Sequence, residues 1–109
     1  MAIPRTFEMF PAIIRCMSDE QIHSMNEMRT KCAEMFELTD AELEARTPGG
    51  YRTLYNDRFG RAVKTLKDAG LLSSPGRGFF RLTELGDEAY NHGPENIDLK
   101  YIRELTGKE

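Results

Sequence analysis

The stretch that most constrains the fold runs from Lys64 to Gly86 and reads KTLKDAGLLSSPGRGFFRLTELG. It contains a basic helix that ends at Gly70, followed by two short apolar segments separated by a Pro-Gly-Arg-Gly turn. Thr83 is a suitable N-cap for another helix. The chain is therefore expected to place a β-hairpin, at about residues 71–82, between two helices.

Apolar residues at helical spacing predict the other elements. Two capping boxes, Ser24 with Glu27 and Thr39 with Glu42, mark helix starts. A short strand contact is expected near Ile22. The expected helices cover Thr6–Met17, a segment starting at Ser24, Asp40–Arg46, Arg52–Ala69, Glu84–Asn91 and Asp98–Leu105.

This order predicts a mainly α fold with a small β-hairpin wing, the winged helix-turn-helix class. With 109 residues the chain suits one domain, residues 1–109, with a modest core. No repeat or composition shift indicates a domain boundary.

The charge is distributed unevenly along the chain. The segment from Arg46 to Arg81 holds eight positive and two negative residues and so carries +6, whereas the rest carries −9 and the whole chain −3. A strongly basic third inside an acidic protein is typical of a nucleic-acid-binding face.

Other features exclude several classes of protein. No apolar run approaches the length of about 20 residues that spans a bilayer, and the amino terminus does not read as a secretory signal, so we expect a cytoplasmic protein. Cys16 and Cys32 are expected to be reduced, buried thiols. His23 and His92 lack metal-ligand spacing, and no nucleophile–base arrangement stands out. We therefore expect no metal, no cofactor and no catalytic residue.

The expected long helix has a buried stripe and a charged outer face. In helix-turn-helix proteins the first residues of the second helix reach base edges in the major groove. Base reading is therefore assigned to Thr53, Asn56 and Arg61, and phosphate contacts to Arg52, Arg58 and Lys64. The alternative is an ordinary solvated face, which the acidic Asp57 and Asp68 on the same side favour.

Arg77, flanked by Gly76 and Gly78 in the expected turn, is assigned a contact with the DNA backbone or minor groove. The alternative is a plain turn with a solvated arginine.

The segment NDRFGRAVKTLKDAGLLSSPGRGFFRLTELG, residues 56–86, resembles the N-terminal winged-helix domain of Mrr-type restriction endonucleases. The similarity extends to the start, IPRTFEMFPAIIRCM, and to PENIDLKYIREL near the end. The chain differs at Arg61, where the family usually has an aromatic residue. The resemblance implies a DNA-binding domain that delivers a separate C-terminal nuclease domain to modified DNA, and we expect that nuclease domain to be absent from this chain.

The resulting hypothesis is a non-enzymatic winged-helix domain that binds double-stranded DNA. Two alternatives stay open, a protein–protein interaction module and a freestanding transcriptional regulator. A homodimer through the terminal helices is a further option, as is a nuclease partner encoded elsewhere.

Overall fold

The computed structural model describes residues 3–19, 21–50 and 52–107. The chain begins with a 3-10 turn, η1 (Thr6–Met9), which runs directly into helix α1 (Phe10–Cys16). Pro11 lies in the first turn of α1, where its missing N–H is not needed. The helix expected over Thr6–Met17 is thus confirmed, with its first four residues wound more tightly.

The capping boxes fix the next two helices. Strand β1 (His23–Ser24) leads into α2 (Met25–Met35), and Ser24 Oγ accepts from the Glu27 backbone N–H at 3.1 Å. The strand contact expected at Ile22 falls one residue later. Helix α3 (Asp40–Glu44) starts at the cap Thr39 as expected and ends two residues early.

The long helix, α4 (Leu54–Asp68), begins two residues later than expected because Thr53 caps it, accepting the Asn56 backbone N–H at 3.2 Å. Just before the helix, Arg46 and Thr53 form an antiparallel bridge that closes the loop between α3 and α4. Gly70 ends the helix region with a φ of +88°, in the left-handed region that favours glycine.

The hairpin consists of β2 (Leu72–Gly76) and β3 (Phe79–Leu82), followed by α5 (Glu84–His92). The expected four-residue turn is wrong in detail, because β2 continues through Gly76 and leaves only Arg77 and Gly78 between the strands. Gly78 makes this tight turn possible with a φ of +79°. Pro75 is tolerated because β2 is an edge strand and the pairing is irregular between Ser73 and Gly76.

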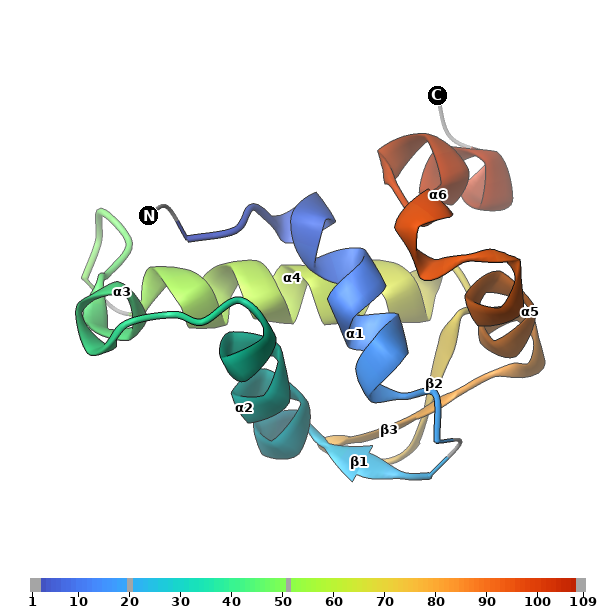
Figure 1. Ribbon diagram of the computed structural model, residues 1–109, viewed down its shortest axis with the longest axis horizontal. Helices are drawn as coiled ribbons and strands as arrows, with labels where there is room; N and C mark the ends of the chain where they lie inside the picture. The colour runs from blue at the N-terminus through green and yellow to red at the C-terminus, as the bar shows by residue number, and fades with distance from the viewer. Residues whose placement is uncertain (1–2, 20, 51, 108–109) are drawn as a thin grey trace.

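The described chain closes with a second 3-10 turn, η2 (Pro94–Asn96), and helix α6 (Leu99–Thr106). Helix α6 starts one residue later than expected because Asp98 caps it. Both lie with α5 at the end of the molecule where α4 terminates (Figure 1). No helix in the described ranges is both long and apolar enough to cross a membrane.

The three strands form an antiparallel sheet in the order β1-β3-β2. With α1, α2 and α4, this sheet is a winged-helix arrangement in which α3 is inserted before the long helix. The predicted buried stripe of α4 is confirmed: Tyr55, Phe59, Ala62, Val63 and Leu66 are all almost completely buried.

Gly86 explains why α5 packs so closely on the start of the hairpin. A Cβ at this position would collide with the Leu71 carbonyl oxygen and the Leu82 side chain. The hairpin is therefore anchored rigidly between α4 and α5, and its free end projects away from them (Figure 1).

Candidate nucleic-acid interface

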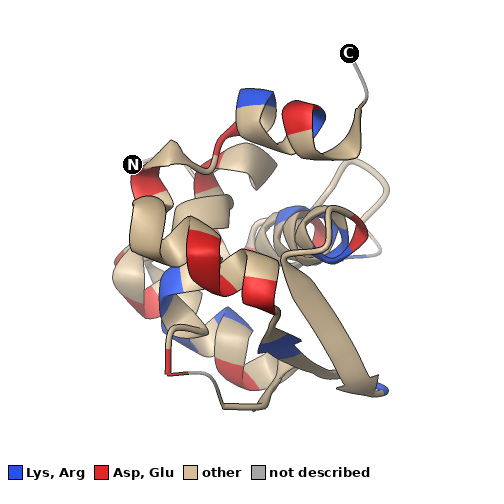
Figure 2. Cartoon of the chain, turned by 90° about the vertical axis from the view of Figure 1, so that its right-hand side faces the viewer, with Lys and Arg blue, Asp and Glu red and all other residues tan. Residues whose placement is uncertain are grey.

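Helix α4 and the hairpin lie on the same side of the molecule (Figure 2). The side of α4 that points away from the core is called the outer face here. It carries Asp57, Gly60, Arg61, Lys64 and Asp68, and so confirms the charged outer face predicted for this helix. None of these is buried, so the face is accessible.

The cations of the outer face are paired with carboxylates. Asp57 accepts from Arg61 Nε at 3.1 Å and lies 3.6 Å from Arg52 Nη1, and Asp68 accepts from Lys64 Nζ at 2.9 Å. The three cationic side chains are between 68% and 75% exposed. Exposed pairs of this kind contribute roughly 0–1 kcal/mol, so a phosphate can compete for the cation. The positive potential of this face is nevertheless weaker than a count of its lysines and arginines indicates.

Thr53 and Asn56 stand at the amino-terminal end of α4, where base contacts were predicted. The Thr53 hydroxyl oxygen is engaged as the helix cap, which leaves its own O–H as a donor. Asn56 is exposed on the first turn. Both base contacts stay predictions, and Asn56 is the more exposed of the two side chains.

Arg58 lies on the opposite flank of α4, toward the amino-terminal segment. Its Nη1 donates to the Ile3 carbonyl oxygen at 2.8 Å and to the Pro4 carbonyl oxygen at 3.4 Å, and the side chain is partly buried. This geometry gives Arg58 a structural task, so its predicted phosphate contact is the assignment with the least support.

Arg77 occupies the two-residue turn at the tip of the hairpin and is exposed. The tip is held in place, because the Met25 backbone N–H donates to the Gly78 carbonyl oxygen at 2.9 Å. The start of α2 therefore holds the tip of the hairpin, and the exposed Arg77 lies next to this hydrogen bond.

The structure adds one cationic feature that the sequence did not reveal. A hollow of about 510 Å³ lies between α2, the loop before α4 and the first turns of α4, and it is called the arginine hollow here. Three of its lining residues are Arg29, Arg46 and Arg52, and Asn56 and Gly60 also line it. Among the described residues, no acidic side chain lines this hollow.

Arg29 reaches the hollow from α2, which lies outside the basic segment of the sequence. The Tyr55 hydroxyl donates to the Arg29 carbonyl oxygen at 2.6 Å and so fixes α2 against α4. The two residues are 26 positions apart, and no local pattern in the sequence signals this contact.

Both thiols are free, as predicted, but the predicted burial is complete only for Cys32, whereas Cys16 is partly exposed. Burial raises the pKa of Cys32 to about 12 and also raises the pKa of Cys16, so both stay protonated near neutral pH.

Within the described ranges, no group of three or more histidine, cysteine, aspartate or glutamate residues has the geometry to hold a metal ion.

Comparison with known protein families identifies the family of this chain. The family model described as the Mrr N-terminal domain matches residues 7–92, which span the chain from η1 to the end of α5. The chain belongs to the Mrr N-terminal domain family. No curated protein and no solved structure matched the chain in the same comparisons.

Family membership links this Mrr N-terminal domain to Mrr-type restriction systems. Arg61 stands where the resemblance implied an aromatic residue. The Arg61 side chain is 72% exposed, so this position belongs to the surface of the Mrr N-terminal domain and not to its core.

Proposed function

We propose that this Mrr N-terminal domain binds double-stranded DNA and catalyses no reaction itself. The observation that carries the proposal is spatial: α4 and the hairpin lie on the same side of the fold (Figure 2), and the arginine hollow adjoins the first turns of α4. An α-helix fits the major groove of B-DNA, and arginines around it bind phosphates.

In this arrangement α4 enters the major groove with its amino-terminal end first. Asn56 and Arg61 face base edges, with Thr53 beside them. Arg52, Lys64 and the arginine hollow hold phosphates, and Arg77 lies along the backbone at the wing. The domain thereby serves as the DNA-targeting part of a restriction system, with cleavage left to a nuclease.

Salt dependence of the affinity tests this proposal. If about five phosphates are neutralised, the plot of log Kd for a duplex against log salt concentration has a slope with a magnitude of about 4–5. Arg77→Ala is expected to reduce that magnitude by about 1, and Arg103→Ala, on the exposed surface of α6, serves as the matched control. A duplex that fails to bind at low salt, with or without base modification, contradicts the proposal.

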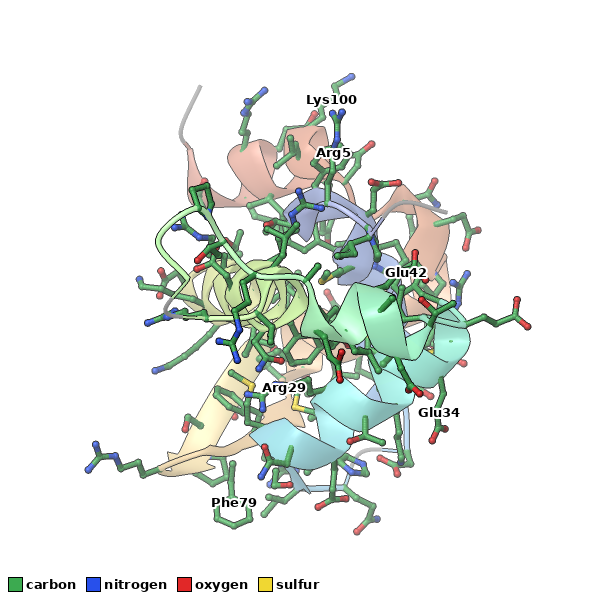
Figure 3. The ribbon with its side chains drawn as sticks, turned by 90° about the vertical axis from the view of Figure 1, so that its left-hand side faces the viewer. Arg5, Arg29, Glu34, Glu42, Phe79 and Lys100 are labelled. Carbon is green, nitrogen blue, oxygen red and sulfur yellow. The ribbon has the colours of Figure 1, made fainter. Side chains whose placement is uncertain are left out.

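One observation favours a second candidate, a protein–protein contact. Ile22 is 51% exposed and Phe79 is 48% exposed, and Phe79 pairs with Ser24 on the sheet. Phe79 points away from α4 at the lower end of the sheet (Figure 3). Phe79→Ser is therefore expected to leave duplex affinity intact while weakening any self-association seen by sedimentation.

A further inference from the structure

A second cavity, of about 350 Å³, adjoins the arginine hollow between α2, α3 and the first turn of α4, and it is called the apolar pocket here. Much of its wall is apolar and comes from Ala33, Leu38, Leu43 and Tyr55. The two cavities share Arg29, Thr53 and Asn56. One end of this combined site is cationic and the other is apolar.

Arg29, labelled in Figure 3, lines both cavities and so lies at their junction. Its Nη1 donates to Asn26 Oδ1 at 3.0 Å, whereas its Nε is buried and has no hydrogen-bond partner among the described residues. A buried N–H without an acceptor is unfavourable, and such donors are normally satisfied. A ligand with an acceptor at this junction would satisfy it.

The far rim of the apolar pocket has the opposite character. Glu34 and Glu37 line it, and both side chains are exposed. Carboxylates repel a phosphate but accept hydrogen bonds from an exocyclic amine, as they do from cytosine N4. The site thus presents arginines at one end, apolar surface in the middle and acceptors at the other end.

We propose that the two cavities form a site for one unpaired nucleotide, with the phosphate in the arginine hollow and an amino-bearing base in the apolar pocket. Cavities of about 300–1,000 Å³ are usual for small ligands, and both volumes fall in this range. Proteins that hold single nucleotides combine a cationic groove with apolar or aromatic surface in the same way. If the nucleotide belongs to DNA, this proposal rests on the DNA binding proposed above.

Two duplexes test the site with the wild-type protein. They are identical except that one carries a single unpaired 2-aminopurine, whose fluorescence reports its surroundings. We expect Kd for the bulged duplex to be about tenfold lower than for the paired duplex, because only the unpaired base can bury its face against the apolar wall of the pocket. The fluorescence of the unpaired base is expected to change on binding.

A free mononucleotide has the same chemistry, so dAMP is titrated separately by NMR. Shifts at Ala33 and Leu43 with dAMP, together with equal affinities for the two duplexes, support the site with a free nucleotide as its source. Equal affinities without any effect of dAMP overturn it. If neither duplex binds, the proposed DNA binding fails, and the dAMP titration alone then decides whether the site exists.

A matched pair of variants locates the base. Ala33→Leu fills the apolar pocket from α2, and Ala41→Leu makes the same change on the exposed surface of α3, outside the pocket lining. We expect Ala33→Leu to abolish the preference for the bulged duplex and Ala41→Leu to keep it. A preference that survives Ala33→Leu, in a variant with an unchanged circular dichroism spectrum, overturns the placement of the base.

Discussion

The outer face of α4 and the arginine hollow carry the same kind of charge but differ in what lies beside it. On the outer face, Asp57 and Asp68 contact the cations at 2.9–3.6 Å. In the hollow, Arg29, Arg46 and Arg52 line the wall and no carboxylate among the described residues does, and of the three only Arg52 also belongs to the outer-face pairs, at 3.6 Å from Asp57. If DNA binds as proposed, we expect the position of the counterions, and not the number of cations, to determine which region binds a phosphate more tightly.

The largest change in duplex affinity is expected when cations of the arginine hollow are removed, and the same substitutions on the outer face give the comparison. Replacing Arg29 and Arg46 together by glutamine is expected to weaken duplex binding by about 100-fold at 50 mM salt, since two counterion-releasing contacts are lost. Replacing Arg61 and Lys64 in the same way should cost only about tenfold, because their carboxylate partners already offset their charge. Fluorescence anisotropy titrations measure both.

The control for this comparison is the pair Lys100→Gln and Arg103→Gln on α6. Both side chains are exposed, and Lys100 lies at the opposite end of the molecule from the hairpin (Figure 3). A loss in this control similar to that in the hollow would show that only net charge matters. Equal losses from the hollow and the outer face would remove the distinction drawn here.

Arg58 provides the next test, because it separates a structural arginine from a phosphate-binding one. Arg58→Ala should lower the free energy of unfolding by about 2 kcal/mol, since charge-assisted hydrogen bonds to the Ile3 and Pro4 carbonyl oxygens are lost. Urea denaturation followed by circular dichroism measures this. The salt slope of duplex binding should stay the same, and a slope reduced by about 1 would restore the phosphate contact predicted from the sequence.

A substitution at Asp57 tests the same comparison in the opposite direction, because it removes a carboxylate from the outer face and leaves two of the cations there unpaired, as in the hollow. Asp57→Asn releases both Arg52 and Arg61 from their shared carboxylate. Duplex affinity should rise by about threefold to tenfold at low salt, with a steeper salt slope. Asp40→Asn, an exposed acid on α3, is the matched control. An unchanged affinity would mean that the outer face does not meet phosphates.

The fold was largely predictable because its boundaries depend on local chemistry. Ser24, Thr39, Thr53 and Thr83 each cap the next helix through their own side chains, and every cap lies within a few residues of its partner. The pairs Asp57–Arg61 and Lys64–Asp68 also follow from a spacing of four on one helix.

The rest of the candidate site depends on contacts between distant parts of the chain. Arg58 is held by carbonyl oxygens 54 and 55 positions away, and Arg29 is brought to α4 by Tyr55. Neither contact has a periodic signature, so helical spacing alone assigned Arg58 to DNA and omitted Arg29. Side chains on one helix face can be predicted from sequence, whereas the neighbours that neutralise or engage them require the tertiary structure.

The His23 side chain offers a third arrangement, in which one imidazole ring lies between two carboxylates. The His23 ring nitrogens lie 2.9 Å from Asp19 and 3.2 Å from Glu27. The pKa of Asp19 is lowered by hydrogen bonds from the Gln21 backbone and from His23. The pKa of Glu27 is lowered by hydrogen bonds from His23 and from the Ser24 backbone.

Because both carboxyl groups bind protons less readily in the folded protein, their stabilising effect is present above their unfolded pKa values. It is lost as the pH falls through the folded values. The ordinary values are 3.8 and 4.5, so the urea midpoint is expected to decline modestly once the pH drops below 4.5. His23→Gln should flatten this decline, and His92→Gln, on the exposed end of α5, should not. If the urea midpoint of His23→Gln declines as steeply as that of the wild type, other groups cause the acid sensitivity. The contacts of His23 with these two carboxylates then do not stabilise β1 against the wing.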